Sequence, residues 1–298
     1  MSFVDGPVTV EVPATSANLG PGFDCLGLAL ALVDTLVGEV TGGGLEVEVE
    51  GEGSTEIDCD ETHLVVRSMR AAFAALGEEP PGLRLRCTNR IPHSRGLGSS
   101  SAAIVGGIVL ARALVEGGEA RLDAELALAL ANRIEGHPDN VAPALIGGFV
   151  VSGQAGDEVW AQQSPVDESV SAVVFIPPHG VRTDVARGLL PDVVPHADAA
   201  ANTGRAALLV AALGGHPAML MRATEDFLHQ QHREAAMPES LELVRDLREA
   251  GIAAVISGAG PTVLAFVVGD SEPLAALAPT GWQTLPQTVG GPGARVLM

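Results

Sequence analysis

A run of glycine and serine residues at positions 92–102 could bind phosphate. It reads Pro92-His93-Ser94-Arg95-Gly96-Leu97-Gly98-Ser99-Ser100-Ser101-Ala102, and a long stretch of small residues follows it. Glycines let a backbone approach a ligand closely, and the first amides of a helix have no partners inside that helix. Together with the helix dipole, these amides form an anion site. A glycine turn with a serine cap is the alternative, and two glycines alone would favour it. The added serines and the long helix favour phosphate binding.

The basic residues narrow the chemistry further. All 17 are arginines, because the sequence contains no lysine, and it contains no tyrosine. A P-loop of the GxxxxGK[ST] type is excluded because its lysine contacts the nucleotide phosphates. Schiff-base and pyridoxal chemistry are excluded because both need a lysine amine. Any ATP chemistry must therefore use backbone amides, hydroxyls, arginines and a metal ion.

Bulk composition predicts a folded metabolic enzyme. The 298 residues are 47% hydrophobic and 18% charged, which permits a large core, and the net charge of -20 repels nucleic acid and anionic membranes. We find no apolar run long enough to span a bilayer and no signal-like leader. The three scattered cysteines favour reduced thiols. We expect a cytoplasmic protein with a small-molecule substrate and no nucleic-acid or membrane partner. We also expect a homodimer, although no residue pattern specifies the oligomeric state.

Strands and helices are predicted to intermix in both halves of the chain, which makes the fold class α+β. Alternating apolar residues predict strands at 8–12, 45–49 and 83–87, and apolar runs predict further strands at 172–176, 252–257 and 262–268. Helical patterns cover 64–76 (closed by Gly77), 99–115, 123–134, 204–213, 218–230 and 238–250. The polar stretch 153–168 interrupts the pattern, so we predict two domains, residues 1–165 and 166–298. The Gly/Pro-rich tail after Leu277 is expected to be partly loose.

The motifs resemble those of the GHMP kinases. Residues 92–102 match that family's second motif, P-x-x-x-G-L-G-S-S-x-A, and 257–262 (SGAGPT) resemble its third. Residues 13–24 (PATSANLGPGFD) and 135–144 (EGHPDNVAPA) resemble the versions found in homoserine kinases. The resemblance implies an N-terminal nucleotide domain like domain 2 of ribosomal protein S5 and a ferredoxin-like C-terminal domain. It also implies ATP-dependent, Mg²⁺-assisted phosphorylation of the L-homoserine hydroxyl, a step of threonine biosynthesis.

The resemblance also implies which residues bind the nucleotide and the metal. All of residues 92–102 would surround the phosphates, with His63 and Val65 near the adenine. Many homoserine kinases have Asn-Leu-Val where this chain has His63-Leu64-Val65. A neutral histidine offers either a donor or an acceptor from one edge, not both. Ser100 and Glu135 would hold Mg²⁺, which prefers hard oxygen ligands.

Homoserine carries a carboxylate, an ammonium group and a hydroxyl. Arg187 and Arg233 match family positions for the carboxylate, for which the planar guanidinium is suited. Asn18 and Asp24 match the ammonium position. Alone, each arginine would be read as a surface residue, and Asp24 as part of a turn.

The remaining predicted roles concern the transfer itself. Asp139 and Asn140, which we expect in a loop, and Thr183 would assist in-line attack of the hydroxyl; an Asx turn is the alternative at 139–140. Two other functions stay open: a sister GHMP kinase acting on another alcohol, such as mevalonate or a sugar, and a non-catalytic GHMP-fold binding protein.

Overall fold

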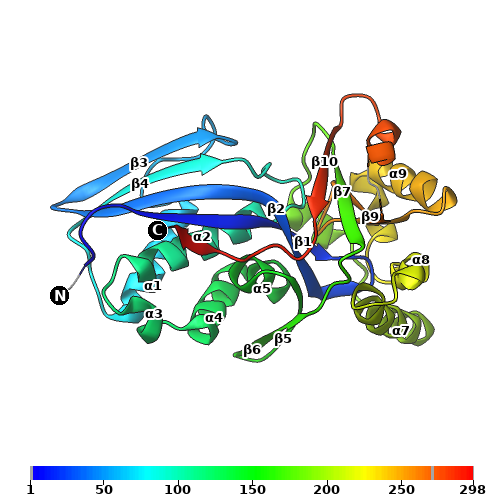
Figure 1. Cartoon of the computed structure of the whole chain (residues 1–298), viewed down its shortest axis with the longest axis horizontal. Coiled ribbons are helices and arrows are strands. Elements are labelled where there is room, and N and C mark those ends of the chain that lie inside the picture. Colours follow the sequence, from blue (N-terminus) through cyan, green and yellow to red (C-terminus); the bar gives the residue numbers. More distant parts are fainter. Residues whose placement is uncertain (1–2, 270–271, 298) are drawn as a thin grey trace.

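The computed structural model of the chain describes residues 3–269 and 272–297, and it contains two β-sheets with helices packed against them (Figure 1). The larger sheet has the order β11-β1-β2-β4-β3, with β5 paired to β2 and β6 paired to β5. Its strands are β1 (Val8–Asn18), β2 (Gly22–Thr41), β3 (Gly44–Gly51), β4 (Gly82–Asn89), β5 (Phe149–Ala155), β6 (Glu158–Ser164) and β11 (Arg295–Leu297).

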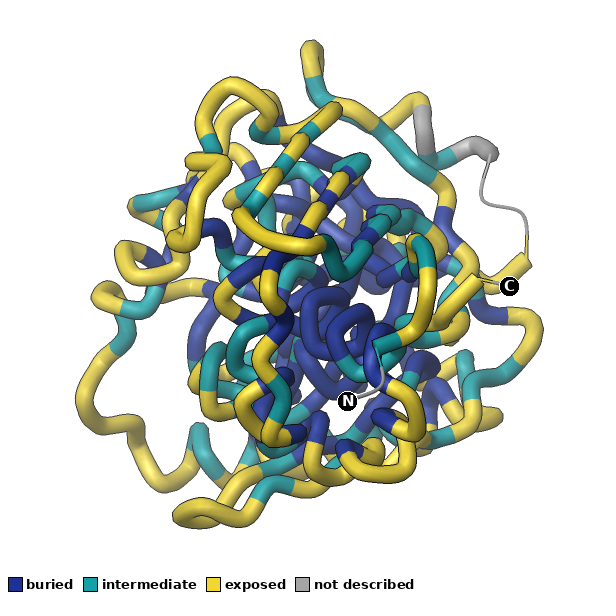
Figure 2. Tube along the Cα trace, turned by 90° about the vertical axis from the view of Figure 1, so that its left-hand side faces the viewer, coloured by how far each residue is buried: buried dark blue, intermediate teal, exposed yellow. Residues whose placement is uncertain are grey.

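Helices cover one face of this larger sheet, and α2 is the innermost (Figure 1). They are α1 (Leu64–Leu76), α2 (Ser99–Ala113), α3 (Gly118–Arg121), α4 (Ala124–Glu135) and α5 (Pro138–Ile146). Helix α2 is apolar around most of its circumference, as expected of a helix packed between a sheet and other helices. Figure 2 shows the buried residues gathered at the centre of the molecule and the exposed ones at its rim.

The opposite face of the sheet is charged at β3 and β4. Glu46, Glu48 and Glu50 are exposed in alternation with half-buried apolar residues, as the sequence predicts. Arg84 pairs with Glu46 at 2.8 Å and Arg86 with Glu48 at 2.9 Å across the two strands. Such exposed pairs contribute little stability, so the layer of helices on the other face accounts for the fold of this sheet.

The smaller sheet has the order β10-β7-β9-β8 and is covered on both faces. Alternate residues of β7 separate its two cores: Val174 packs with α7 and the larger sheet, whereas Phe175 packs with α9. The strands are β7 (Val170–Ile176), β8 (Ala253–Ile256), β9 (Val263–Val268) and β10 (Gln283–Thr288). The helices are α6 (Thr183–Gly188), α7 (His196–Leu213), α8 (Leu220–Ala223) and α9 (Pro238–Glu249).

Many predicted elements are confirmed. The six predicted strands correspond to β1, β3, β4, β7, β8 and β9, and the helix predicted at 64–76 is α1. Gly77 ends α1 in the left-handed conformation, at φ 69°, and Asp123 caps α4 by accepting from the Leu126 amide at 3.0 Å. The mixed α+β class is confirmed. The domain division at residue 165 stays a prediction, and β11 returns to pair with β1 of the larger sheet.

Other predicted elements are wrong. The helix predicted at 218–230 is only a 3₁₀ turn at 217–219 followed by α8, because Asp226 accepts from the amides of residues 228–230 and stabilises an irregular segment. The polar stretch 153–168 is largely the β5–β6 hairpin. The tail after Leu277 contains β10 and β11. The predicted loop at 139–140 lies within α5, and β2 was not predicted at all.

Within the described residues, no helix is both long enough and apolar enough to cross a bilayer.

Candidate active site

The glycine-serine segment forms a tight turn between β4 and α2. Gly98 is the N-cap of α2 at φ 69°, and a Cβ there would lie 2.0 Å from the Thr15 hydroxyl, so glycine is required. The Thr15 amide donates to the Leu97 carbonyl at 3.0 Å, and the Ser257 hydroxyl donates to the Gly96 carbonyl at 2.6 Å. The first and third motifs therefore hold the second, leaving the first amides of α2 for a ligand.

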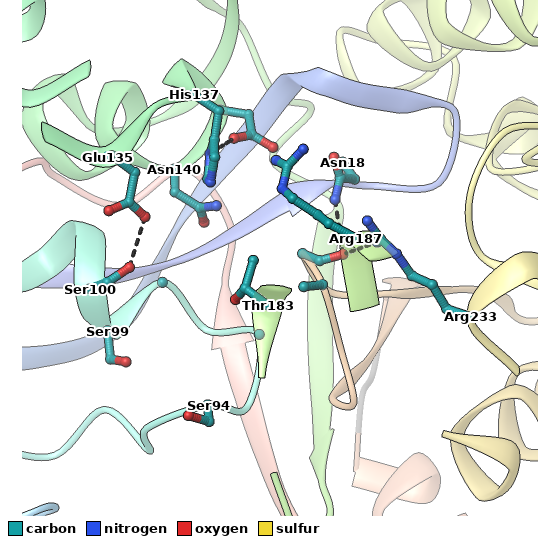
Figure 3. Close-up of a pocket in the computed structure, with 15 residues that line it drawn as sticks. Asn18, Ser94, Ser99, Ser100, Glu135, His137, Asn140, Thr183, Arg187 and Arg233 are labelled. Atoms are coloured by element: carbon teal, nitrogen blue, oxygen red, sulfur yellow. Dashed lines mark hydrogen bonds and ion pairs between the residues drawn. The ribbon is translucent and has the colours of Figure 1, made fainter. Parts of the chain in front are cut away.

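Two cavities meet at the start of α2. The first, about 150 Å³, contains charged residues of both signs (Figure 3). It is lined by Asn18, Ser94, Gly96, Gly98, Ser99, Ser100, Glu135, His137, Asp139, Asn140, Thr183, Arg187, Arg233, Gly258 and Ala259. The second, about 290 Å³, is more apolar, and it shares Ser94, Ser99 and Ser100 with the first. The helix N-terminus thus stands between a polar cavity and an apolar one.

The apolar cavity contains the residues predicted to contact adenine. His63 and Val65 both line it, with His93 and Ala102 of the turn. His63 is 5% exposed, and neither ring nitrogen has a hydrogen-bond partner among the described residues. Burial lowers the pKa of His63, so the ring is neutral at pH 7 and carries one donor and one acceptor. A buried, unsatisfied ring of this kind fits the polar edge of a base.

Four residues of the turn line neither cavity: Pro92, Arg95, Leu97 and Ser101. Leu97 and Ser101 are buried beneath the turn. The Arg95 side chain points to backbone carbonyls instead. It donates to Pro177 and Pro178 at 3.2 and 2.6 Å. The predicted nucleotide contacts of these four residues are therefore not supported by their side-chain positions, and contacts through their backbone atoms stay predictions.

Of the predicted carboxylate and ammonium residues, Asn18, Arg187 and Arg233 line one end of the polar cavity (Figure 3), and Asp24 is not a lining residue but contacts Arg187 and Asn18. Arg187 pairs with Asp24 through two hydrogen bonds, of 2.7 and 3.2 Å. Hydrogen bonding to the Asp24 carboxylate raises the pKa of Arg187. Asn18 donates to the Gly258 carbonyl at 2.8 Å and accepts from the Asp24 amide at 3.0 Å. Asn18 and Asp24 have φ values of 66° and 54°, in the left-handed region that Asn and Asp enter more readily than other side-chain-bearing residues.

Arg233 is a buried cation with neutral partners. It is 1% exposed, and it donates to the Ala186 and Gly258 carbonyls and to Nδ1 of His229 at 3.1–3.3 Å. Burial and the nearby charge of Arg187 lower the pKa of Arg233 to about 10, so it remains charged at pH 7. Burial also lowers the pKa of His229, which is therefore neutral and can accept from the guanidinium. Among the described residues, Nη2 of Arg233 has no hydrogen-bond partner, so it is available to a ligand carboxylate.

Asn140 and Asp139 lie at the middle of the cavity, on α5. The Thr15 hydroxyl donates to Oδ1 of Asn140 at 2.8 Å, which leaves the amide NH₂ available to a ligand. Asp139 is 1% exposed and contacts Nδ1 of His137 at 2.7 Å. Burial opposes a charge on His137, but the hydrogen bond and charge of Asp139, together with Glu135, raise its pKa. Thr183 faces the same space from α6 (Figure 3).

Glu135, at the other end of the cavity, lies against the start of α2. Its Oε1 accepts from the hydroxyls of Ser100 and Ser101 at 2.7 and 2.8 Å. No group of three or more His, Cys, Asp or Glu residues gathers in the described part of the chain in a way that could hold a metal alone. One carboxylate beside a hydroxyl fits Mg²⁺, which usually completes its shell with phosphate oxygens and water.

Sequence reasoning missed Thr15 and His137. Both lie inside motifs that the sequence singled out, each within three residues of a named position, Asn18 or Asn140. Their hydrogen bonds to Asn140 and Asp139 are the signals that identify them, and these bonds exist only in the folded chain.

Two family models match the chain. The GHMP kinases N terminal domain covers residues 63–148, and the GHMP kinases C terminal domain covers residues 207–280. These matches, the two sheets and the position of the α2 N-terminus between two cavities define the class of this protein as a GHMP kinase, which confirms the predicted fold. 

Comparison with individual relatives shows which family of GHMP kinases the chain belongs to. The homoserine kinase of Streptomyces coelicolor is 56% identical, over 99% of this chain and 96% of its own length, and that of Leifsonia xyli is 50% identical, over 97% and 91%. The crystal structure of homoserine kinase from Cytophaga hutchinsonii superposes with a TM-score of 0.88 at 26% identity, covering 100% of this chain and 99% of that one. The chain belongs to the homoserine kinase family.

Proposed function

We propose that the chain transfers the γ-phosphoryl group of ATP to the side-chain hydroxyl of L-homoserine and so forms O-phospho-L-homoserine, a step of threonine biosynthesis. The observation that supports this most strongly is the position of the α2 N-terminus, which borders an apolar cavity on one side and a polar, charged cavity on the other. A base would fit the first and an amino acid the second, with the phosphates at the helix amides between them.

The charges of the polar cavity suit a zwitterion with a hydroxyl. Arg233, assisted by Arg187, would bind the carboxylate, and Asp24 with the Asn18 turn would bind the ammonium group. A neutral sugar would leave Arg233 buried and unpaired, which is unfavourable, and mevalonate, which has a carboxylate, would bring no ammonium group to Asp24. This charge pattern, with the high identity to homoserine kinases, favours homoserine over mevalonate or a sugar. The intact polar residues likewise argue against a binding protein without chemistry.

The same order of residues suits phosphoryl transfer. The residues that line the polar cavity extend from Glu135 and Ser100 at one end, past Asn140 and Thr183, to Arg187 and Arg233 at the other (Figure 3). An amino acid held by Arg233 would direct its hydroxyl toward Asn140, whose NH₂ can donate to the attacking oxygen. Asp139 and Thr183 would orient the same group. Phosphoryl transfer depends mainly on such positioning and on charge stabilisation.

Ser100 and Glu135 would hold the metal ion. Mg²⁺ bound there would neutralise charge on the β- and γ-phosphates. The Glu135 carboxylate accepts a hydrogen bond from Ser100 in the first turn of α2, so it lies beside the predicted phosphate site. A divalent ion bound there would balance the charges of the carboxylate and the phosphates.

An ADP-release assay tests the function. We expect ADP release with L-homoserine and ATP that requires Mg²⁺, and much less release with mevalonate, galactose, 4-hydroxybutanoate (no ammonium group) or 3-amino-1-propanol (no carboxylate). Faster turnover of mevalonate or galactose would identify a sister kinase. Calorimetric binding of L-homoserine without ADP release from any alcohol would indicate a binding protein.

The proposal also includes a cellular location and an oligomeric state. The protein would act in the cytoplasm, since Cys25, Cys59 and Cys87 are free thiols. It would work as a homodimer without nucleic acid, and light scattering coupled to size exclusion would measure its mass.

A further inference from the structure

Arg95 belongs to the phosphate-binding turn by sequence, yet its guanidinium is directed away from both cavities. Nε donates to the Pro177 carbonyl at 3.2 Å and Nη2 to the Pro178 carbonyl at 2.6 Å, while Nη1 donates to the His93 carbonyl at 2.9 Å. It forms no ion pair among the described residues. Hydrogen bonds from a charged donor are stronger than neutral ones, so this side chain firmly joins the turn to residues 177–178.

The backbone beside Arg95 reinforces this junction. The Val181 amide donates to the Ser94 carbonyl at 3.0 Å. A Cβ on Gly180 would lie 2.4 Å from Nη1 of Arg95 and 2.8 Å from the Ser94 carbonyl oxygen, so only glycine permits the approach without a shift. The segment after β7 is thus attached directly to the turn at the entrance of α2.

This segment leads into α6, which carries two cavity residues. Helix α6 starts at Thr183 and includes Arg187, but only Ala186 of its six residues is buried. Its other side-chain attachments are the Arg187–Asp24 ion pair and the hydrogen bond from Arg233 to the Ala186 carbonyl. Both of these groups are ones that a bound amino acid would engage. Ala186 also packs in the apolar core of the smaller sheet, so the junction at Arg95 is the polar attachment among the described residues that is independent of the acceptor.

We propose that Arg95 is a positioning residue that fixes α6 relative to the phosphate-binding turn, and through it aligns Thr183 and Arg187 with the γ-phosphate. This inference rests on the proposed function, since it assumes that the polar cavity binds the acceptor alcohol. The Arg95 side chain lines neither cavity. Its loss should therefore weaken acceptor binding and turnover while nucleotide binding to the free enzyme is preserved.

Arg95→Met removes the donors while keeping an unbranched side chain. We expect kcat/KM for the acceptor to fall at least tenfold, while the Kd for a non-hydrolysable ATP analogue with Mg²⁺, measured by calorimetry without acceptor, changes less than threefold. Arg95→Lys, which keeps one charged donor group, should give an intermediate loss. The matched control is Arg90→Met, because Arg90 is exposed and precedes the same turn; it should match the wild type in both measurements.

Gly180→Ala tests the same junction from the other side and carries the test if Arg95→Met fails to fold. It should reproduce the acceptor defect with normal nucleotide binding, and the double variant should be no worse than the more severe single variant. A tenfold loss of analogue affinity in Arg95→Met would mean that Arg95 binds the nucleotide, and unchanged acceptor kinetics would mean that the junction is irrelevant. Either result overturns the inference. The comparison uses whichever alcohol the wild-type enzyme phosphorylates, so it is separate from the failure of L-homoserine as substrate.

Discussion

Arg187, which lines the polar cavity, and Asp24, 163 positions away in the chain, form an ion pair with two hydrogen bonds, with Nη2 2.7 Å from Oδ1 and Nη1 3.2 Å from Oδ2. The residues predicted to bind the two charged groups on the α-carbon of the substrate, the carboxylate and the ammonium group, therefore bind each other in this structure. A zwitterion entering the cavity would find both charges already positioned. The buried Arg233, whose partners are neutral, supplies the cation that needs an anion.

Asp24→Asn should reveal the ammonium site. Hydrogen bonds to charged groups contribute about 1.5–3 kcal/mol, so we expect the KM for L-homoserine to rise about tenfold or more. The KM for 4-hydroxybutanoate, which lacks the ammonium group, should stay unchanged or fall, because Arg187 is released. Steady-state kinetics with both alcohols measure this. Asp184→Asn is the control, since its side chain is exposed and paired with Arg182, the N-cap residue of α6. Equal losses for both alcohols would contradict the assignment.

Asn140→Ala should lower kcat at least tenfold, because the variant removes the donor that would orient the attacking hydroxyl. The Thr15 hydroxyl loses its acceptor in the same change, so thermal unfolding should be measured beside the kinetics. Asn132→Ala is a suitable control, because Asn132 binds Gln154 away from the cavities. Unchanged turnover in Asn140→Ala would remove Asn140 from the mechanism.

Glu135→Gln should weaken the use of Mg²⁺. A neutral amide binds a hard divalent ion less well than a carboxylate does, so the Mg²⁺ concentration for half-maximal ADP release should rise at least tenfold. Titration of Mg²⁺ at fixed ATP measures the effect. Glu125→Gln, in the exposed first turn of the same helix, controls for lost surface charge. An unaltered Mg²⁺ requirement would exclude Glu135 as a ligand.

Asp34→Asn should stabilise the protein at neutral pH. Burial raises the pKa of Asp34 from 3.8 to about 6, although the amides of Arg90 and Ile91 donate to it. The Asp34 carboxyl holds its proton more tightly in the folded protein than in the unfolded chain. The stability that the protonated carboxyl contributes is therefore fully present below about pH 3.8 and is lost as the pH rises through about 6. At pH 7.5 we expect the free energy of unfolding to rise by about 1–3 kcal/mol, since one pKa unit corresponds to about 1.4 kcal/mol.

Urea unfolding at several pH values between 4 and 7.5 measures this difference, which should vanish near the acidic end. Asp58→Asn, an exposed change, should show no such dependence on pH. A variant that is less stable than the wild type at pH 7.5 would mean that the ionised carboxylate is favourable there.

Local patterns were sufficient for much of this fold. The glycine at the end of α1, the aspartate before α4 and the alternation of β3 and β4 each act over a few residues, so the sequence reveals them. The elements that were missed depend on distant partners. Strand β2 pairs with β1, β4 and β5, and β11 pairs with β1, which lies almost a full chain length away. No short window contains those pairings.

The sequence by itself determined the class of chemistry: the absence of lysine excluded several mechanisms, and the glycine-serine turn before a helix of small residues predicted phosphate binding, because anion binding there needs only local backbone geometry. The tertiary structure alone decided how the side chains are paired. Arg187 contacts Asp24, Asn140 is oriented by Thr15, and Arg95 is directed to the segment before α6. These contacts join residues separated by 82 to 163 positions, and only the packing of the two sheets brings them together.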